Sequence, residues 1–172
     1  MRYRIKKKQP NSKMCLVCGL KNSSGLKSSF YELENDELLA VFTPDEEHQG
    51  YPGRLHGGMA AAILDETIGR AIMVKYPEEI WGVTAEFTIR FKKPIPLNEE
   101  IRVIARVTKD AGRIFEGSGE ILLCDGSAAA LGNGKYFKLS IDKITGPDAG
   151  FDAEEQEWRV VSSTGDPREV EI

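Results

Sequence analysis

The sequence predicts an α+β protein in which a curved antiparallel β-sheet wraps around one long central helix. Three observations support this fold class. One long helical segment, 59–76, lies between two strand-like segments and four later ones. The connections between the later strands are too short for parallel crossovers, which favours antiparallel pairing. The helical segment is apolar on nearly every face, so it needs cover on more than one side.

Two strands and a loop are expected before the helix. The segments 28–34 and 37–43 alternate as strands do and are separated by an Asn-Asp turn. The following segment, 44–58, is rich in Pro, Gly and His and is predicted to be a loop. The helix over 59–76 contains good helix formers and no proline, and Pro77 ends it.

Four strands are expected after the helix, in meander order. Prolines end the first of them, and the Asp125-Gly126 pair is a strong hairpin signal before the last. Glycines weaken that last strand. The four segments are 80–93, 101–109, 113–124 and 127–140.

Composition and charge exclude several classes of protein. A chain of 172 residues suits one domain, and its net charge of -4 argues against general nucleic-acid binding. No stretch reaches the ~18 apolar residues of a membrane span, and no apolar region of a secretory signal follows the basic N-terminus. Three cysteines are too few for a disulfide framework, so a reducing, cytoplasmic location is expected.

The charge distribution predicts three regions. Residues 1–26 form a basic segment and a Cys-containing lead-in, 27–140 form the folded domain, and 141–172 form an acidic extension. Both charged ends are predicted to be solvated tails, with attraction between the two ends as the alternative.

Two acids interrupt the apolar helix. A buried carboxylate is costly unless another group pairs with it. Glu66 has Arg70 four residues further on and is expected to form an ion pair. Asp65 has no such partner on the helix, so its presence suggests a functional role. The alternative is an acid at an exposed edge, or one bonded to a neighbouring strand.

The helix is preceded by Leu55-His56-Gly57-Gly58. The first amides of a helix lack intrahelical partners and lie at the positive end of its dipole. Glycines there let a ligand approach the backbone, which makes an oxyanion site plausible. The alternative is a tight entry into the helix in which His56 is only a cap residue.

Helix geometry constrains how these groups can cooperate. Gly57 and Asp65 are eight residues apart, which is about 12 Å along a helix. A general base must lie within a hydrogen bond, or one water, of the group it activates. The two groups of one chain therefore cannot serve the same carbonyl. Two antiparallel helices across a two-fold axis can combine them into two equivalent sites, so a homodimer is expected.

The segment 56–66, HGGMAAAILDE, is similar to the signature of the hot dog-fold acyl-CoA thioesterases of the phenylacetate-pathway type (the PaaI-like, 4HBT superfamily). The match is His-Gly-Gly followed by an acid nine residues after the His. The flanking segments 49–53 and 83–87 match as well, and 15–26 resembles a lead-in found in one branch of the superfamily. The resemblance covers roughly residues 15–138.

This resemblance implies a hot dog fold, a homodimer that can pair again into a homotetramer, and acyl-CoA thioesterase activity. Asp65 would act as general base or nucleophile. The N–H of Gly57, with Gly58 beside it, would polarise the thioester carbonyl. His56 would support that loop, and Thr84 would help to position the water.

Further residues follow from the same resemblance. Some relatives carry an asparagine six residues before the His; here that position is glycine, and the neighbouring Gln49 is the candidate replacement. No cofactor is expected beyond the coenzyme A of the substrate. Arg113, and after it Lys109 and Arg90, are candidates to bind its phosphates, although such charges are commonly solvated surface. Glu66 is also included among the substrate-site candidates.

Other functions are less favoured. Cys15-x-x-Cys18 supplies only two of the four ligands of a structural zinc site, so no metal is expected. Hot dog dehydratases pair an acid with a catalytic His, and neither His48 nor His56 has the usual spacing from an acid. A non-catalytic acyl-CoA-binding or sensing protein stays as the alternative.

Overall fold

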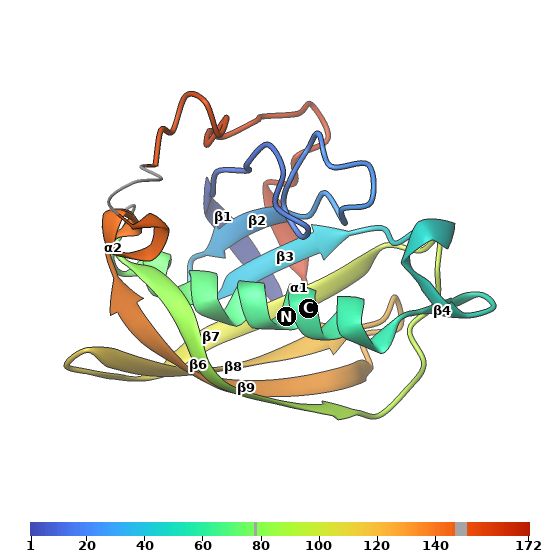
Figure 1. Ribbon diagram of the computed structural model, residues 1–172. Coiled ribbons are helices and arrows are strands. Elements are labelled where there is room, and N and C mark those ends of the chain that lie inside the picture. The colour runs from blue at the N-terminus through green and yellow to red at the C-terminus, as the bar shows by residue number, and fades with distance from the viewer. Residues whose placement is uncertain (78, 147–150) are drawn as a thin grey trace.

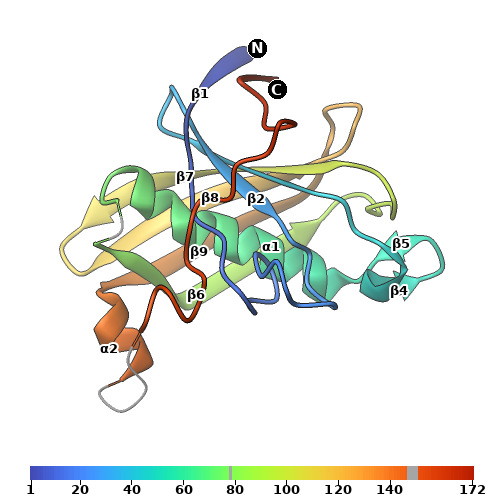
Figure 2. The same cartoon turned by 90° about the horizontal axis from the view of Figure 1, so that it is seen from above.

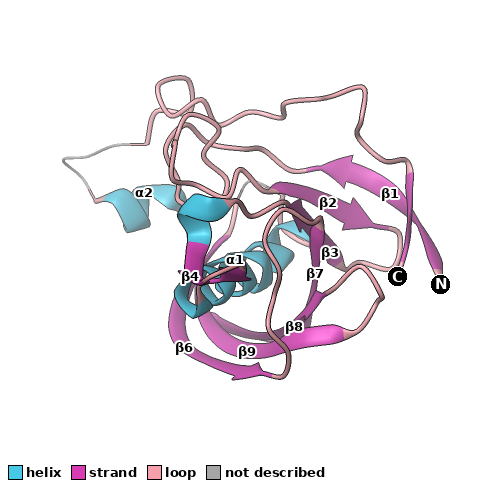
Figure 3. Ribbon diagram, turned by 90° about the vertical axis from the view of Figure 1, so that its right-hand side faces the viewer, coloured by secondary structure: helices cyan, strands magenta, loops and turns pink. Residues whose placement is uncertain are grey.

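The computed structural model describes residues 1–77, 79–146 and 151–172. Helix α1 (Gly57–Arg70) lies in the concave face of a curved antiparallel sheet, as Figures 1 and 3 show from two sides. Within the described residues this sheet has eight strands, in the order β10-β1-β2-β3-β7-β8-β9-β6. Their bounds are β1 Arg2–Lys8, β2 Ser29–Leu33, β3 Leu38–Phe42, β6 Trp81–Phe91, β7 Ile101–Ala111, β8 Ile114–Leu122, β9 Ala128–Leu139 and β10 Glu169–Glu171.

Smaller elements surround α1. The hairpin of β4 (Gln49–Tyr51) and β5 (Arg54–Leu55) leads into it, after a 3₁₀ turn at Glu46–His48. A second 3₁₀ turn, Ala71–Val74, continues it, and the short helix α2 (Ile141–Thr145) follows β9. Helix α1 thus begins two residues earlier than predicted, and the last predicted turn is 3₁₀ rather than α, which is common at helix ends.

The predicted fold class, a curved antiparallel sheet around one central helix, is confirmed. The predicted meander of four strands is wrong in one respect. Strands β7, β8 and β9 follow each other, but β6 pairs with β9 at the sheet edge and not with β7, whose other neighbour is β3. The 14-residue α1 spans about 21 Å, so it returns the chain to the far edge of the sheet.

The core lies between α1 and the sheet. Ile63, Leu64 and Ile68 of α1 have no exposed surface and belong to one apolar cluster with Phe115 of β8. One face of α1 stays partly exposed and includes Met59, Ala61, Ala62, Asp65 and Glu66. The single chain therefore buries most of this apolar helix but not all of it. None of the described helices is both long and apolar enough to cross a membrane.

The charged ends of the chain are not the solvated tails that the charge distribution predicted. Residues 2–8 form β1, which pairs with β2 on one side and with β10 on the other. The alternative, attraction between the two ends, is confirmed by ion pairs. Lys8 Nζ lies 2.6 Å from the carboxylate of Asp166, and Arg2 lies 3.5 Å from Glu169. The two termini consequently lie side by side (Figure 2).

A close approach of α1 to β6 fixes the position of the helix over the sheet edge. A Cβ atom added at Gly82 of β6 would lie 2.6 Å from the backbone oxygen of Gly69 and 2.9 Å from the ring of Phe115. Only glycine fits this contact, because backbone atoms cannot move aside as a flexible side chain can. The contact lies two residues from Thr84, so it sets how near that strand comes to the helix.

We therefore expect Gly82→Ala to destabilise the fold by about 1–3 kcal/mol, the usual cost of overpacking a core contact. Gly165→Ala is the matched control, since the nearest atom to an added Cβ there is Ser163 Oγ at 3.7 Å. Urea unfolding of both variants measures the free energies of unfolding. Equal stability of the two variants would contradict this role for the Gly82 contact.

Candidate active site

The Asp65 carboxylate lies where α1 crosses β6 and β9. Thr84 of β6 donates its hydroxyl hydrogen to this carboxylate, with Oγ1 3.0 Å from both oxygens. Tyr136 of β9 donates its phenol hydrogen to Oδ1 at 2.9 Å. Thr84 and Tyr136 are register partners in the β6–β9 pair, so they project to the same face of the sheet. Asp65 therefore has partners, and they lie on neighbouring strands rather than on its own helix.

The surroundings make this carboxylate more basic than an exposed one. Burial raises the pKa of Asp65 above its usual value of 3.8; the hydrogen bonds from Tyr136 and Thr84 oppose this shift, and the charge of Glu66 adds to it. Burial, and then the charge of Asp65, raise the pKa of Tyr136, which keeps its phenol protonated as a donor. A carboxylate with a raised pKa that adjoins a cavity is suited to accept a proton.

A cavity of about 210 Å³ adjoins the carboxylate. Its walls include Asp65, Thr84 and Tyr136, together with the adjacent Glu66 and with Arg70 from the next turn of α1. The residues that sequence reasoning singled out in the middle of the helix thus share one cavity with a tyrosine that it missed.

The two glycines at the N-terminus of α1 differ in whether their backbone N–H groups already have an acceptor. His56 is the N-cap residue, and its Nδ1 accepts the N–H of Gly58 at 2.9 Å. Among the described residues, the N–H of Gly57 has no hydrogen-bond acceptor, and the residue is exposed. The interpretation of His56 as a cap residue is confirmed. The Gly57 N–H is the amide that is available to a ligand, while that of Gly58 is occupied.

The side-chain amide of Gln49 forms a hydrogen bond within the loop before α1. The side-chain oxygen of Gln49 accepts the N–H of Gly53 at 2.9 Å, within the β4–β5 hairpin. The backbone N–H of His56 is held by the carbonyl of the buried His48 at 2.8 Å. His48, rather than Gln49, is thus the residue seen to support the helix start.

The predicted ion pair of Glu66 and Arg70 is present, with Nε 2.9 Å from Oε1. The basic candidates for phosphate binding lie elsewhere. Lys109 pairs with Glu116 at 3.3 Å across β7 and β8. The exposed Arg113 lies in the turn before β8, and the exposed Arg90 lies on β6. None of these three basic residues lines the cavity beside Asp65.

Sequence reasoning missed Tyr136, although a signal for it exists. In the sequence, the polar Asn133 and Lys135 alternate with Gly132, Gly134 and Tyr136, and in the structure residues 132, 134 and 136 are buried. This period of two identifies the inward face of β9. It does not identify Asp65 as the partner, because that requires β6 and β9 to be neighbours.

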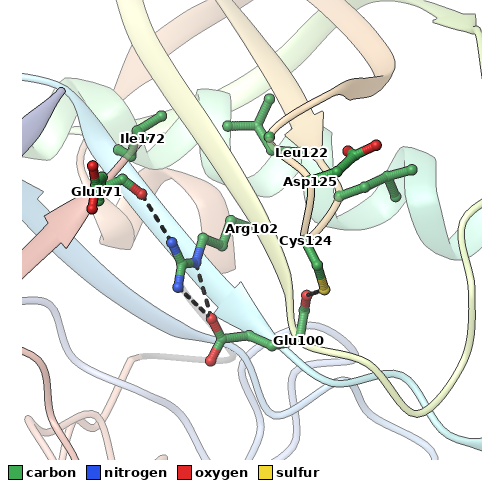
Figure 4. Close-up of a pocket in the computed structure, with 9 residues that line it drawn as sticks. Glu100, Arg102, Leu122, Cys124, Asp125, Glu171 and Ile172 are labelled. Carbon is green, nitrogen blue, oxygen red and sulfur yellow. Dashed lines mark hydrogen bonds and ion pairs between the residues drawn. The ribbon is translucent and has the colours of Figure 1, made fainter.

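A second cavity, of about 320 Å³, lies at the opposite side of the fold, where β7 and β8 meet the C-terminus (Figure 4). Its Arg102 is already engaged, with Glu100 at 2.8 Å and with the carbonyl of Glu171 at 3.0 Å. The exposed Cys124 also lines it. None of the predicted catalytic residues lies among its lining residues.

Comparison with known proteins indicates the class of protein that this chain resembles. Residues 52–129 match the family model of the thioesterase superfamily. Acyl-coenzyme A thioesterase THEM4 of Rattus norvegicus is 37% identical over 84 residues, which cover 49% of this chain and 35% of that protein. An uncharacterised protein of Schizosaccharomyces pombe is 28% identical over 98 residues, covering 57% and 55%. The chain spans about half, or less, of the length of these relatives.

Solved structures share the fold. A thioesterase superfamily protein superposes with a TM-score of 0.66 and 26% identity, over 72% of this chain and 59% of that one. The PaaI protein of E. coli, from the phenylacetic acid degradation operon, has a TM-score of 0.60 at 17% identity, over 67% and 81%, and supports the fold alone. The structure is thus a hot dog fold. Residues 52–129 are the part of the chain that matches the thioesterase superfamily model.

Replacing Tyr136 by Phe tests how the carboxylate is held. The change removes the donor to Asp65 but keeps the ring that stacks on Phe115 at 5.0 Å. Because this hydrogen bond stabilises the ionised form, we expect the pKa of Asp65 to rise further in the variant. Carboxyl ¹³C NMR titration measures the change, with the exposed Tyr51→Phe as control. An Asp65 pKa that falls or stays constant in the Tyr136 variant would contradict the assignment.

Proposed function

We propose that this protein is an acyl-CoA thioesterase that hydrolyses a thioester to free coenzyme A and a carboxylic acid. The observation that carries the proposal is the Asp65 carboxylate, partly buried, hydrogen-bonded by Thr84 and Tyr136 and adjoining a cavity. The match of residues 52–129 to the thioesterase superfamily model and the similarity to acyl-coenzyme A thioesterase THEM4 support the same reaction.

The carboxylate is suited to activate a water molecule. Asp65 takes a proton from water as the water oxygen attacks the thioester carbon. The C–S bond then breaks, and the proton passes to the departing thiolate of coenzyme A. Thr84 and Tyr136 keep the carboxylate oriented throughout. Direct attack by Asp65, with a mixed anhydride that water then hydrolyses, is the alternative use of the same group.

The oxyanion that forms on the carbonyl needs an N–H donor, and the Gly57 amide is the free one. In one chain it lies about 12 Å from Asp65, because both residues belong to α1 at a rise of ~1.5 Å per residue. The proposal therefore includes a homodimer in which Asp65 of one copy and Gly57 of the other serve one substrate.

Three features support such a dimer. Strand β6 lies at the sheet edge and pairs only with β9 among the described strands, so its other edge can accept a strand. Along α1, Met59, Ala61 and Ala62 stay partly exposed. Phe91 of β6 is 52% exposed and lies beside Gly57, where a second copy would cover it.

We expect Asp65→Asn to lower turnover of acyl-CoA substrates by two or more orders of magnitude with the fold retained, as expected for loss of a general base. In the wild type, turnover should fall as the pH drops through the Asp65 pKa, which lies above 3.8, because the protonated carboxyl cannot accept a proton. Release of free thiol from a panel of acyl-CoAs measures both effects.

The matched control for this variant is Glu86→Gln. Glu86 lies two residues from Thr84 on β6, is exposed, and pairs with Lys135 at 2.9 Å. The Glu86→Gln variant should keep wild-type turnover. Equal hydrolysis by Asp65→Asn and the wild type would remove Asp65 from the mechanism. Binding of acyl-CoA by the wild type without hydrolysis would favour the sensing protein instead.

A further inference from the structure

The lead-in before β2 places two thiols against the helix that carries Asp65. The sulfurs of Cys15 and Cys18 and a carboxylate oxygen of Glu66 all lie within 4.8 Å of one another. The two cysteines are three residues apart in a turn closed by the Gly19 N–H and the Cys15 carbonyl at 2.8 Å. This turn brings the two sulfurs within 4.8 Å of each other, against the ~2.05 Å of a disulfide bond. The pair is therefore close enough for its side chains to be joined.

The two thiols have different partners. Cys18 Sγ accepts a hydrogen bond from Arg70 Nη2 at 3.0 Å and lies 3.3 Å from Ser12 Oγ. The single thiol hydrogen of Cys15 is shared between two acceptors, since Glu66 Oε2 lies 3.2 Å from its sulfur and the Cys18 sulfur lies within 4.8 Å. Cys18 is thus surrounded by donors, which favours its thiolate, whereas Cys15 faces a carboxylate, which favours its protonated form.

The pKa values of the two thiols differ because their hydrogen-bond partners differ. The hydrogen bond from Cys15 and the charge of Arg70 lower the pKa of Cys18 to about 7, against the opposing effect of burial. The hydrogen bond to Cys18, burial and the charge of Glu66 raise the pKa of Cys15. Near neutral pH the pair therefore holds one thiolate and one thiol, as a nucleophile with a resolving partner requires.

The cluster is poorly suited to a metal ion. The guanidinium of Arg70 already supplies the positive charge, since it contacts both Glu66 and Cys18 and is itself buried. A divalent cation would have to lie beside this fixed charge. Cys18 is 1% exposed, which shields it from bulky disulfide reagents.

We propose that Cys15 and Cys18 form a peroxide-sensitive dithiol that closes into an intramolecular disulfide against the active-site helix. The Cys18 thiolate attacks hydrogen peroxide, and one oxygen atom transfers to sulfur; the other leaves as hydroxide and becomes water. The sulfur of Cys15 then attacks the Cys18 sulfenic acid, gives up its proton, and releases a second water. Two thiols are oxidised and one peroxide is reduced to two waters.

The disulfide changes contacts that the Asp65 cavity shares. Closure removes the thiolate partner of Arg70 and the thiol donor of Glu66, and both of these residues line that cavity. Resting on the proposed thioesterase function, we infer that oxidation lowers turnover and that reduction restores it.

The test uses the full chain with Cys124→Ser, because Cys124 is the exposed third cysteine. After treatment with hydrogen peroxide, mass spectrometry should show the loss of two hydrogen atoms and one peptide cross-link between Cys15 and Cys18, reversed by dithiothreitol. Cys15→Ser in the same background cannot form the cross-link and is the matched control. Two free thiols, or stable sulfinic acid, in place of the cross-link would overturn the proposal. So would stoichiometric zinc binding by the reduced chain that resists a chelator.

The pH profile of the oxidation rate gives a second test that a merely structural thiol pair would not pass. The rate should rise as the pH increases through about 7, because the thiolate is the nucleophile. Ser12→Ala removes a bond that lowers the Cys18 pKa, so the midpoint should move up. Glu66→Gln removes a charge that raises it, so the midpoint should move down. Shifts of the same sign in both variants would contradict the arrangement.

Activity separates this proposal from the thioesterase assignment. Oxidation should lower thioester turnover reversibly in the Cys124→Ser background and leave its Cys15→Ser variant unchanged. A fully cross-linked sample with the turnover of the reduced protein would contradict the link to the site. Reduced protein without any turnover would contradict the thioesterase function, while the mass and pH measurements would still decide the disulfide.

Discussion

A partly buried carboxylate in the middle of an apolar helix is the constraint on which the rest of this structure depends. Asp65 needs donors to offset its desolvation, and they come from Thr84 and Tyr136. These two residues lie opposite each other only because β6 returns to the sheet edge beside β9. The glycine contact of Gly82 with Gly69 then brings helix and strand close enough for the hydrogen bonds to form.

Much of this arrangement was predictable because it is local. The apolar helix, its central acids, the Glu66–Arg70 pair and the Gly-Gly entry are all visible within one short segment of sequence. The period of two likewise predicts most strands of the sheet. Asp65 could be singled out because its helical neighbours offer no partner, a purely local argument.

The features that sequence reasoning missed depend on contacts between distant segments. The order of β6 relative to β7 and β9 is not specified by hairpin signals, since β6 is joined to the sheet by a long connection. Without that order, Tyr136 has no visible relation to Asp65. The basic residues 2–8 and the acidic residues 169–171 looked like solvated tails for the same reason, because their strand pairing joins opposite ends of the chain.

Helix α1 carries three separate functional groups. They are the free amide of Gly57, the carboxylate of Asp65, and the Glu66–Arg70 ion pair, which contacts the thiols of Cys15 and Cys18. The first two lie too far apart in one chain to serve one carbonyl. The Glu66–Arg70 pair lines the same cavity as the Asp65 carboxylate. A composite site between two copies brings the Gly57 amide and the Asp65 carboxylate together, and the proposed disulfide makes the helix sensitive to oxidants.

Complementation between two inactive chains tests the composite site most directly. Gly57→Pro removes the N–H. The ring it adds is compatible with the fold, because proline is tolerated at a first helical position, a Cβ at Gly57 would lie 3.5 Å from Phe91, and His56, at φ -63 and ψ 135, already has the conformation preferred before proline. A purified heterodimer of Gly57→Pro with Asp65→Asn contains one intact composite site, so it should recover about half of wild-type turnover. A heterodimer as inactive as either parent would contradict the shared site.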